Sequence, residues 1–126
     1  MDRILRASAL GVCALAFAAT ANATGNPAAG KSVFQSQCSV CHVTVAGKHS
    51  GIGPNLAGVV GRAAGALPGY SYSSAMKRAH FTWTTAQLQA YLAAPGTVVR
   101  GNKMPFGGLH NPQQLGDLVA YLNTLK

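Results

Sequence analysis

Cys38, Cys41 and His42 are the residues of this chain whose types and spacing are best suited to chemistry. They form the pattern C-x-x-C-H, the sequence to which c-type haem is attached. Residues three and four positions apart share one face of a helix, so all three side chains can address one flat ligand. We therefore expect two thioether bonds from the cysteines to a haem edge and a bond from the His42 imidazole to the iron.

Other interpretations of this motif have less support in the sequence. A thioredoxin-like redox pair also uses C-x-x-C, but it requires a βαβ setting and does not call for the adjacent histidine. A structural zinc site needs two further ligands, and the sequence holds no second cysteine pair. A chance occurrence of the pattern is the remaining alternative.

The first 23 residues have the composition of a secretory signal peptide. Arg3 and Arg6 precede an apolar run over residues 7–19, and Ala21-Asn22-Ala23 offers a cleavage site. The run is shorter than the ~20 apolar residues that a membrane-spanning helix needs, so no stable membrane insertion is expected. We therefore expect a cleaved signal at residues 1–23, one domain at residues 24–126, and a location in the periplasm.

The expected mature chain is strongly basic. Residues 24–126 contain eight Lys and Arg, one Asp and no Glu, which gives a net charge of +7. Such a surface attracts acidic partners and makes their association dependent on salt. The basic residues are mostly scattered singly and no nucleic-acid motif accompanies them, so we expect no nucleic-acid partner.

The spacing of apolar residues predicts an all-α fold, with the clearest helix at the C-terminus. Asn111 is its expected N-cap and Pro112 its first residue. Its apolar face is formed by Leu115, Leu118, Val119, Leu122 and Leu125. Asp117 lies in the half of this helix where the helix dipole favours a negative charge.

The remaining elements must position the haem motif. A helix is expected to begin at Asn26-Pro27 and to run up to the motif, and shorter helices are expected over residues 74–79 and 85–93. Pro95-Gly96 should end the last of these. Residues 47–69 contain seven glycines and two prolines and predict a long loop, for which covering a haem face and edge would be a function.

Together these features resemble class I cytochrome c, in particular the small bacterial cytochromes of the c2 and c550 type, over nearly all of residues 26–126. The resemblance implies the cytochrome c fold. In that fold the N- and C-terminal helices cross, and short helices and Gly-rich loops wrap around one covalent haem c per chain. Gly30 and Phe34 resemble the residues of the first helix that pack against the last, where Leu118 and Tyr121 resemble their partners.

The resemblance also implies roles for residues around the haem. Gly53-Pro54-Asn55-Leu56 resembles the segment whose proline carbonyl accepts the N–H of the proximal histidine, a bond that would fix the His42 tautomer. Met104 resembles the methionine that closes the sixth coordination position. The other implied haem-binding residues are Arg62 facing a propionate, Tyr70, Tyr72 and Trp83 along that edge, Tyr91 near the distal ligand, and Phe106 shielding the distal side.

Two residues depart from the family pattern. Met76 stands where many members carry asparagine, which makes the pocket less polar, and Arg100 stands where a proline often begins the methionine loop. The lysine ring that mitochondrial members place around the haem edge is only partly present here, with Lys48, Arg100 and Lys103 as basic positions on or near that face.

The sixth ligand decides the function. Besides Met104, the alternatives are His110, His49, His80, Met76 and an open position. With His42 and Met104 both bound, substrate cannot reach the iron, which suits a carrier and not an enzyme.

The resemblance thus implies a soluble, monomeric one-electron carrier. Its expected partners are redox proteins with acidic docking surfaces, such as an oxidase, a reductase or a cytochrome bc-type complex. The alternatives left open are an open-site haem enzyme, such as a small peroxidase, and a gas sensor in which Met104 leaves the iron.

Overall fold

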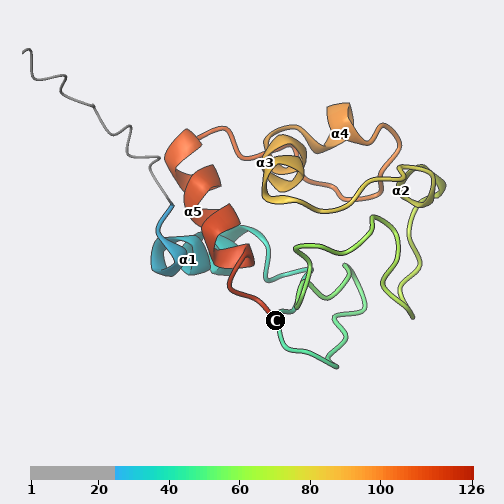
Figure 1. The fold of residues 1–126 in the computed structure, drawn as a ribbon, viewed down its shortest axis with the longest axis horizontal. Helices are drawn as coiled ribbons and strands as arrows, with labels where there is room; N and C mark the ends of the chain where they lie inside the picture. The colour runs from blue at the N-terminus through green and yellow to red at the C-terminus, as the bar shows by residue number, and fades with distance from the viewer. Residues whose placement is uncertain (1–24) are drawn as a thin grey trace, which may run out of the picture.

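The computed structural model describes residues 25–126, and the expected signal peptide at residues 1–23 lies outside them (Figure 1). The described chain confirms the all-α expectation. Its elements in order are α1 (Pro27–Gln37), α2 (Ser74–Lys77), α3 (Thr85–Ala93), α4 (Pro95–Val98) and α5 (Pro112–Leu122). None of the helices in this part of the chain has the length and apolar character needed to span a bilayer.

Both long helices begin at the Asn-Pro pairs that the sequence indicates. The Asn26 side chain accepts hydrogen bonds from the backbone N–H groups of Ala28 at 2.9 Å and Ala29 at 3.2 Å. Asn111 Oδ1 likewise accepts from Gln114 N at 3.0 Å. In each helix a proline occupies the first turn, where its missing N–H costs nothing.

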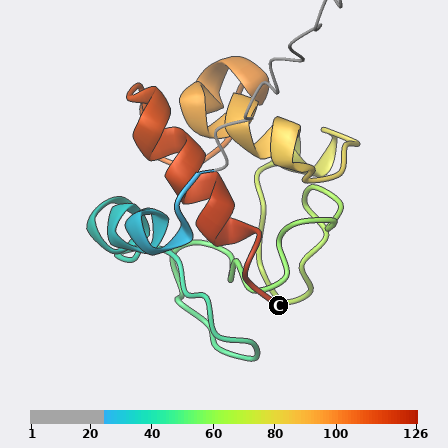
Figure 2. The same cartoon turned by 60° about the vertical axis from the view of Figure 1, so that its left-hand side comes forward.

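Helices α1 and α5 cross, as Figures 1 and 2 show from two directions. Gly30 of α1 lies at the crossing. A Cβ on Gly30 would lie 1.9 Å from Asp117 O and 2.8 Å from Tyr121 Cβ, so only glycine permits this approach. The Phe34 and Tyr121 rings pack beside the crossing with their centroids 5.6 Å apart. The contact expected between these helices is confirmed, and Leu118 of α5 is among the most deeply buried residues of the described chain.

Asp117 has a different role from the one expected. It is the only Asp or Glu in residues 25–126 and is only 6% exposed. Its Oδ1 accepts hydrogen bonds from Asn26 N at 2.7 Å and from Gln113 Nε2 at 2.9 Å. The carboxylate therefore binds the N-terminal end of α1, where the dipole of that helix favours a negative charge, and so joins the two long helices.

The short helices differ in detail from the expected ones. Helix α2 ends at Lys77, two residues early, and His80 follows with φ of 52°, a left-handed conformation that a continuing helix cannot contain. Pro95 does not simply end α3: it begins α4, because its fixed φ suits a first helical turn. Helix α3 begins after Thr84, whose hydroxyl accepts from Gln87 N at 3.1 Å.

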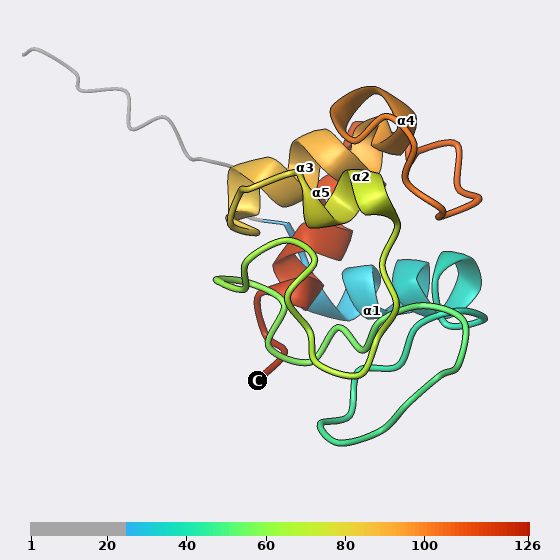
Figure 3. The same cartoon turned by 90° about the vertical axis from the view of Figure 1, so that its right-hand side faces the viewer.

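Between α1 and α2 the chain forms the long loop that the glycines predict. Figure 3 shows this loop on the side of α1, with α2, α3 and α4 grouped above it. An isolated bridge between Ala63 and Thr82 ties the loop to the segment before α3. Gly61 N donates to Trp83 O, and Trp83 N donates to Arg62 O, both at 2.9 Å. These bonds hold the middle of the loop against the segment that precedes α3.

Candidate functional site

The haem-attachment motif follows α1 as a hydrogen-bonded turn. The regular helix ends at Gln37, so it runs up to the motif as expected, and the motif itself lies on the turn beyond it. The turn still accommodates the motif because Cys38 O accepts from Cys41 N at 3.0 Å and from His42 N at 2.9 Å. These bonds keep Cys38, Cys41 and His42 together on one turn.

The two cysteines are half-buried free thiols in this structure. Burial, and then the neighbouring Cys41, raise the pKa of the Cys38 thiol to about 11. Redox-active C-x-x-C pairs have lowered thiol pKa values, so this environment does not favour the thioredoxin-like interpretation. Nor do residues 25–126 contain a cluster of three or more His, Cys, Asp or Glu side chains that would hold a zinc ion.

His42 is held by the backbone of the following loop. Its Nδ1 lies 2.7 Å from Pro54 O, and because a carbonyl only accepts, this nitrogen carries the proton of the bond. Gly53 is buried against the ring, and a Cβ there would lie 2.7 Å from His42 Cε1. Burial lowers the pKa of His42, and the hydrogen bond to Pro54 O offsets part of this effect by raising it. The imidazole is thus kept neutral with Nε2 free, the form that binds metals.

A cavity of about 330 Å³ opens beside this histidine. His42 and Met104 both line it, although they are far apart in the sequence. The structure also brings these expected residues to its wall: Cys41, Pro54, Arg62, Tyr70, Tyr72, Trp83 and Tyr91. Cys38 and Phe106 do not line it, and Phe106 is instead half-buried against the apolar core.

Much of the cavity wall is apolar, and several of its residues were not among the expected ones. They include Leu56, Val59, Leu88, Leu92 and Leu122. Leu88 lies on α3 three residues before Tyr91 and four before Leu92, so it is a helical neighbour of both, and this spacing could have identified it. Met76 lines the cavity as expected, from α2.

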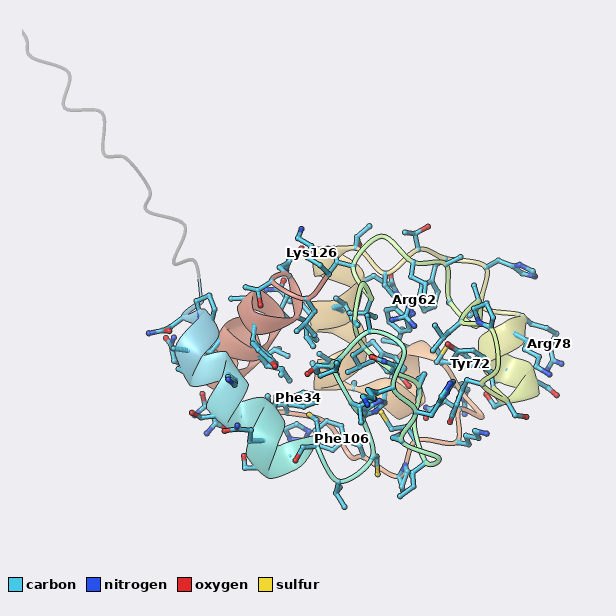
Figure 4. The ribbon with its side chains drawn as sticks, turned by 90° about the horizontal axis from the view of Figure 1, so that it is seen from below. Phe34, Arg62, Tyr72, Arg78, Phe106 and Lys126 are labelled. Carbon is cyan, nitrogen blue, oxygen red and sulfur yellow. The ribbon has the colours of Figure 1, made fainter. Side chains whose placement is uncertain are left out.

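Aromatic and basic side chains close one side of the cavity. Arg62 donates from Nη1 and Nη2 to Asn55 O, both at 2.9 Å, and Figure 4 shows it with Tyr72 in the half of the molecule away from α1. The Tyr70 hydroxyl donates to Ile52 O at 3.0 Å, and its ring meets that of Tyr72 edge-on at 4.7 Å. These bonds fix the long loop around the cavity.

Trp83 and Tyr91 form the buried part of this aromatic wall. Their ring centroids lie 4.9 Å apart, and the Phe81 ring packs edge-on against Trp83 with its centroid at 4.7 Å. Burial, followed by the charge of Tyr70, raises the pKa of Tyr91 to about 12. The Tyr91 phenol therefore stays a neutral hydrogen-bond donor at any physiological pH.

The segment that carries Met104 is braced by its two preceding residues. Asn102 Nδ2 donates to Pro95 O at 3.1 Å and Val99 O at 3.0 Å, while its Oδ1 accepts from Met104 N at 2.9 Å. Lys103 Nζ donates to Ser71 O and lies 4.8 Å from the centre of the Tyr70 ring. Lys103 thus joins the Met104 segment to the opposite wall, a contact that no sequence pattern indicated.

The other histidines lie away from this cavity. His49, His80 and His110 are exposed and do not line it. His110 Nε2 lies 3.3 Å from Gly107 O, within its own turn. In the described chain, therefore, one imidazole and two thioethers, those of Met76 and Met104, reach the cavity.

The donor set of the cavity matches a covalently held haem. A neutral imidazole with a free Nε2, a thiol at the wall and a thioether are the groups that such a cofactor requires. Comparison with known proteins supports the same class. The chain matches the family described as Cytochrome c over residues 27–126.

Individual relatives cover most of the chain. It is 46% identical to cytochrome c2 of Rhodomicrobium vannielii over 88% of both chains. It is 43% identical to cytochrome c of Chlamydomonas reinhardtii, over 78% of this chain and 88% of that one. The solved structure of cytochrome cH from Methylobacterium extorquens superimposes with a TM-score of 0.74 at 42% identity, covering 79% of this chain and 99% of the other.

Fold, cavity and relatives together define a small haem protein of the c type. The chain belongs to the cytochrome c family, and within it to the class I proteins similar to cytochrome c2. Its cofactor is covalently bound haem c, and its function is electron transfer rather than catalysis.

Proposed function

We propose that this protein carries single electrons on a haem whose iron is bound by His42 and Met104. The observation that supports this most directly is that both side chains line one cavity, with His42 Nδ1 already engaged by Pro54 O at 2.7 Å. The haem supplies the one-electron couple of its iron. The chain's residues keep the cofactor dry and hold both ligands in place, so little has to rearrange when its charge changes.

Attachment at Cys38 and Cys41 is part of the proposal. Both thiols follow α1 on the turn that also carries His42, which favours bonds to one edge of a single ligand. Haem should remain with the polypeptide after denaturing extraction, and replacing both cysteines with alanine should release it. Covalent haem retained in that double variant would contradict the assignment.

We assign the remaining wall residues to the haem edge and its surroundings. Arg62, Tyr70, Tyr72 and Trp83 supply the donors suited to propionates, since a buried carboxylate is costly unless it is hydrogen-bonded. Arg62 uses part of its donor set on loop carbonyls and retains further N–H groups for a ligand. Tyr91 is assigned to the neighbourhood of Met104, and Phe106 to shielding of the distal side.

The methionine ligand is tested by a pair of variants, because the cavity holds two thioethers. The oxidised protein should show the near-infrared methionine–iron charge-transfer band. Met104→Ala should abolish this band, lower the midpoint potential and admit carbon monoxide. Met76→Leu is the matched control and should keep the band. Loss of the band only in Met76→Leu would assign the sixth position to Met76, against our proposal.

We further propose export to the periplasm and docking to acidic redox partners. Residues 1–23 would be removed, so mass spectrometry of the exported protein should give an N-terminus at Thr24. The partner, an oxidase, a reductase or a cytochrome bc-type complex, would meet a monomer with an almost purely basic surface. Electron-transfer rates should therefore fall as ionic strength rises, and rates insensitive to salt would refute charge-guided docking.

A further inference from the structure

A second hollow, of about 310 Å³, lies on the outer side of α2 and the segment after α4. Two arginines from different parts of the chain line it, Arg78 at the end of α2 and Arg100 just beyond α4. Figure 4 shows Arg78 at the edge of the molecule opposite α1. The hollow shares no lining residue with the haem cavity.

The two guanidinium groups lack a counter-charge in the described chain. The only acidic side chain of residues 25–126, Asp117, is buried at the junction of α1 and α5. Arg62, by contrast, is bound within the protein, because its guanidinium donates hydrogen bonds to two loop carbonyls. Within residues 25–126 no such side-chain bond engages Arg78 or Arg100. Both side chains are exposed, so their donors are open to an anion from solution.

We propose that Arg78 and Arg100 form a binding site for a phosphate-type oxyanion. Each guanidinium offers a planar fork of donors that matches two oxygens of a phosphate group. Gln87, from α3, lines the same hollow and adds an amide donor. The side chains of Phe81 and Val98 complete the wall.

The position of the site relates it to the haem cavity. Helix α2 places Arg78 in the hollow and Met76 in the cavity wall. Arg100 precedes Asn102, which braces Met104. An anion bound by both arginines therefore joins two segments that enclose the cavity from the outside.

The test is a titration of the haem-loaded protein with inorganic phosphate, at an ionic strength held constant with chloride, followed by amide chemical shifts. Arg78→Gln and Arg100→Gln each remove one guanidinium. Lys77→Gln is the matched control, because Lys77 is the exposed neighbour of Arg78 and does not line the hollow. We expect saturable binding in the natural protein and in Lys77→Gln, and binding weaker by about tenfold or more in both arginine variants.

Two results would overturn the proposal. One is a phosphate response that does not saturate in the natural protein. The other is equal weakening in all three variants, which would show that overall charge, rather than a built site, attracts the ion. The visible spectrum of each variant verifies that the haem environment is intact.

Phosphate groups occur both free and on lipids, and a sedimentation assay distinguishes these sources. The probes are vesicles of phosphatidylcholine with and without phosphatidylglycerol. Once the titration has established the site, vesicle binding that falls more in the arginine variants than in Lys77→Gln identifies a lipid headgroup as the source. An equal fall in all three identifies free phosphate.

Discussion

The crossing of α1 and α5 can be tested by adding one methyl group. In Gly30→Ala the new Cβ would lie 1.9 Å from Asp117 O, whereas real Cβ contacts are essentially never under 3.0 Å. The two backbones must therefore separate by roughly 1.1 Å, because a backbone carbonyl cannot rotate away as a flexible side chain can.

The size of the effect follows from two opposing terms. Overpacking of this kind costs about 1–3 kcal/mol, and a gap of ~1 Å elsewhere in the interface loses up to half of each dispersion contact. Alanine in place of glycine returns up to ~1 kcal/mol of helix propensity. We expect Gly30→Ala to lower the free energy of unfolding by about 2 kcal/mol, a fall in Tm of the order of 10 °C.

The same change at Gly116 is a matched control. Gly116 lies in α5, and a Cβ there would have no neighbour within 4 Å. Gly116→Ala should therefore stabilise the protein by ~0.5–1 kcal/mol. Both variants are measured by guanidinium unfolding of the haem-loaded protein, followed by circular dichroism. The reasoning is refuted if Gly30→Ala is as stable as the natural protein, or if both substitutions destabilise it equally.

Three further predictions concern side chains around the crossing and the cavity. Asp117→Ala leaves Asn26 N–H without its acceptor and should lower the free energy of unfolding, measured by denaturant titration, by about 2–3 kcal/mol. Asp117→Asn should cost less because an oxygen remains to accept the bond. Equal losses in the two variants would contradict the role of the hydrogen bonds. If Met104 binds the iron as proposed, Lys103→Ala should loosen the Met104 segment and speed the displacement of Met104 from the iron by added imidazole about twofold to fivefold in stopped-flow measurements. An unchanged rate would show that Lys103 does not hold the segment. The pKa of Tyr91 is raised from 10.0 to about 12, so between these pH values the unfolded state loses this proton while the folded state keeps it. The stability of the natural protein should then fall more steeply over that range than that of Tyr91→Phe, and parallel pH profiles would contradict this burial effect.

Local signals made much of this fold predictable. The pairs Asn26-Pro27 and Asn111-Pro112 begin helices because the cap bonds and the fixed φ of proline act within a few residues. The motif at Cys41-His42 and the resemblance around Pro54 likewise identified residues that the structure brings to one cavity wall.

Contacts between distant segments were the part that the sequence could not show. Asp117 bonds to Asn26 N across 91 residues, although its position in α5 alone suggested only a local effect on that helix. Lys103 meets Ser71 because two loops converge, and no periodicity reports that. Phe106 follows Met104 closely in the sequence, but the turn closed by its N–H to Met104 O at 2.8 Å places it outside the cavity wall, so its shielding role stays a prediction.

The burial of Asp117 also determines how this protein responds to acid when it meets a partner. Carboxyl side chains ordinarily titrate near pH 4, and residues 25–126 present none at the surface. Apart from the chain end and the haem propionates, residues 25–126 offer no exposed carboxylate, so acidification cannot make the docking face less positive. A loss of association between pH 5 and pH 3 would thus come from protonation of the partner's acids, because the cytochrome does not lose positive charge over that range.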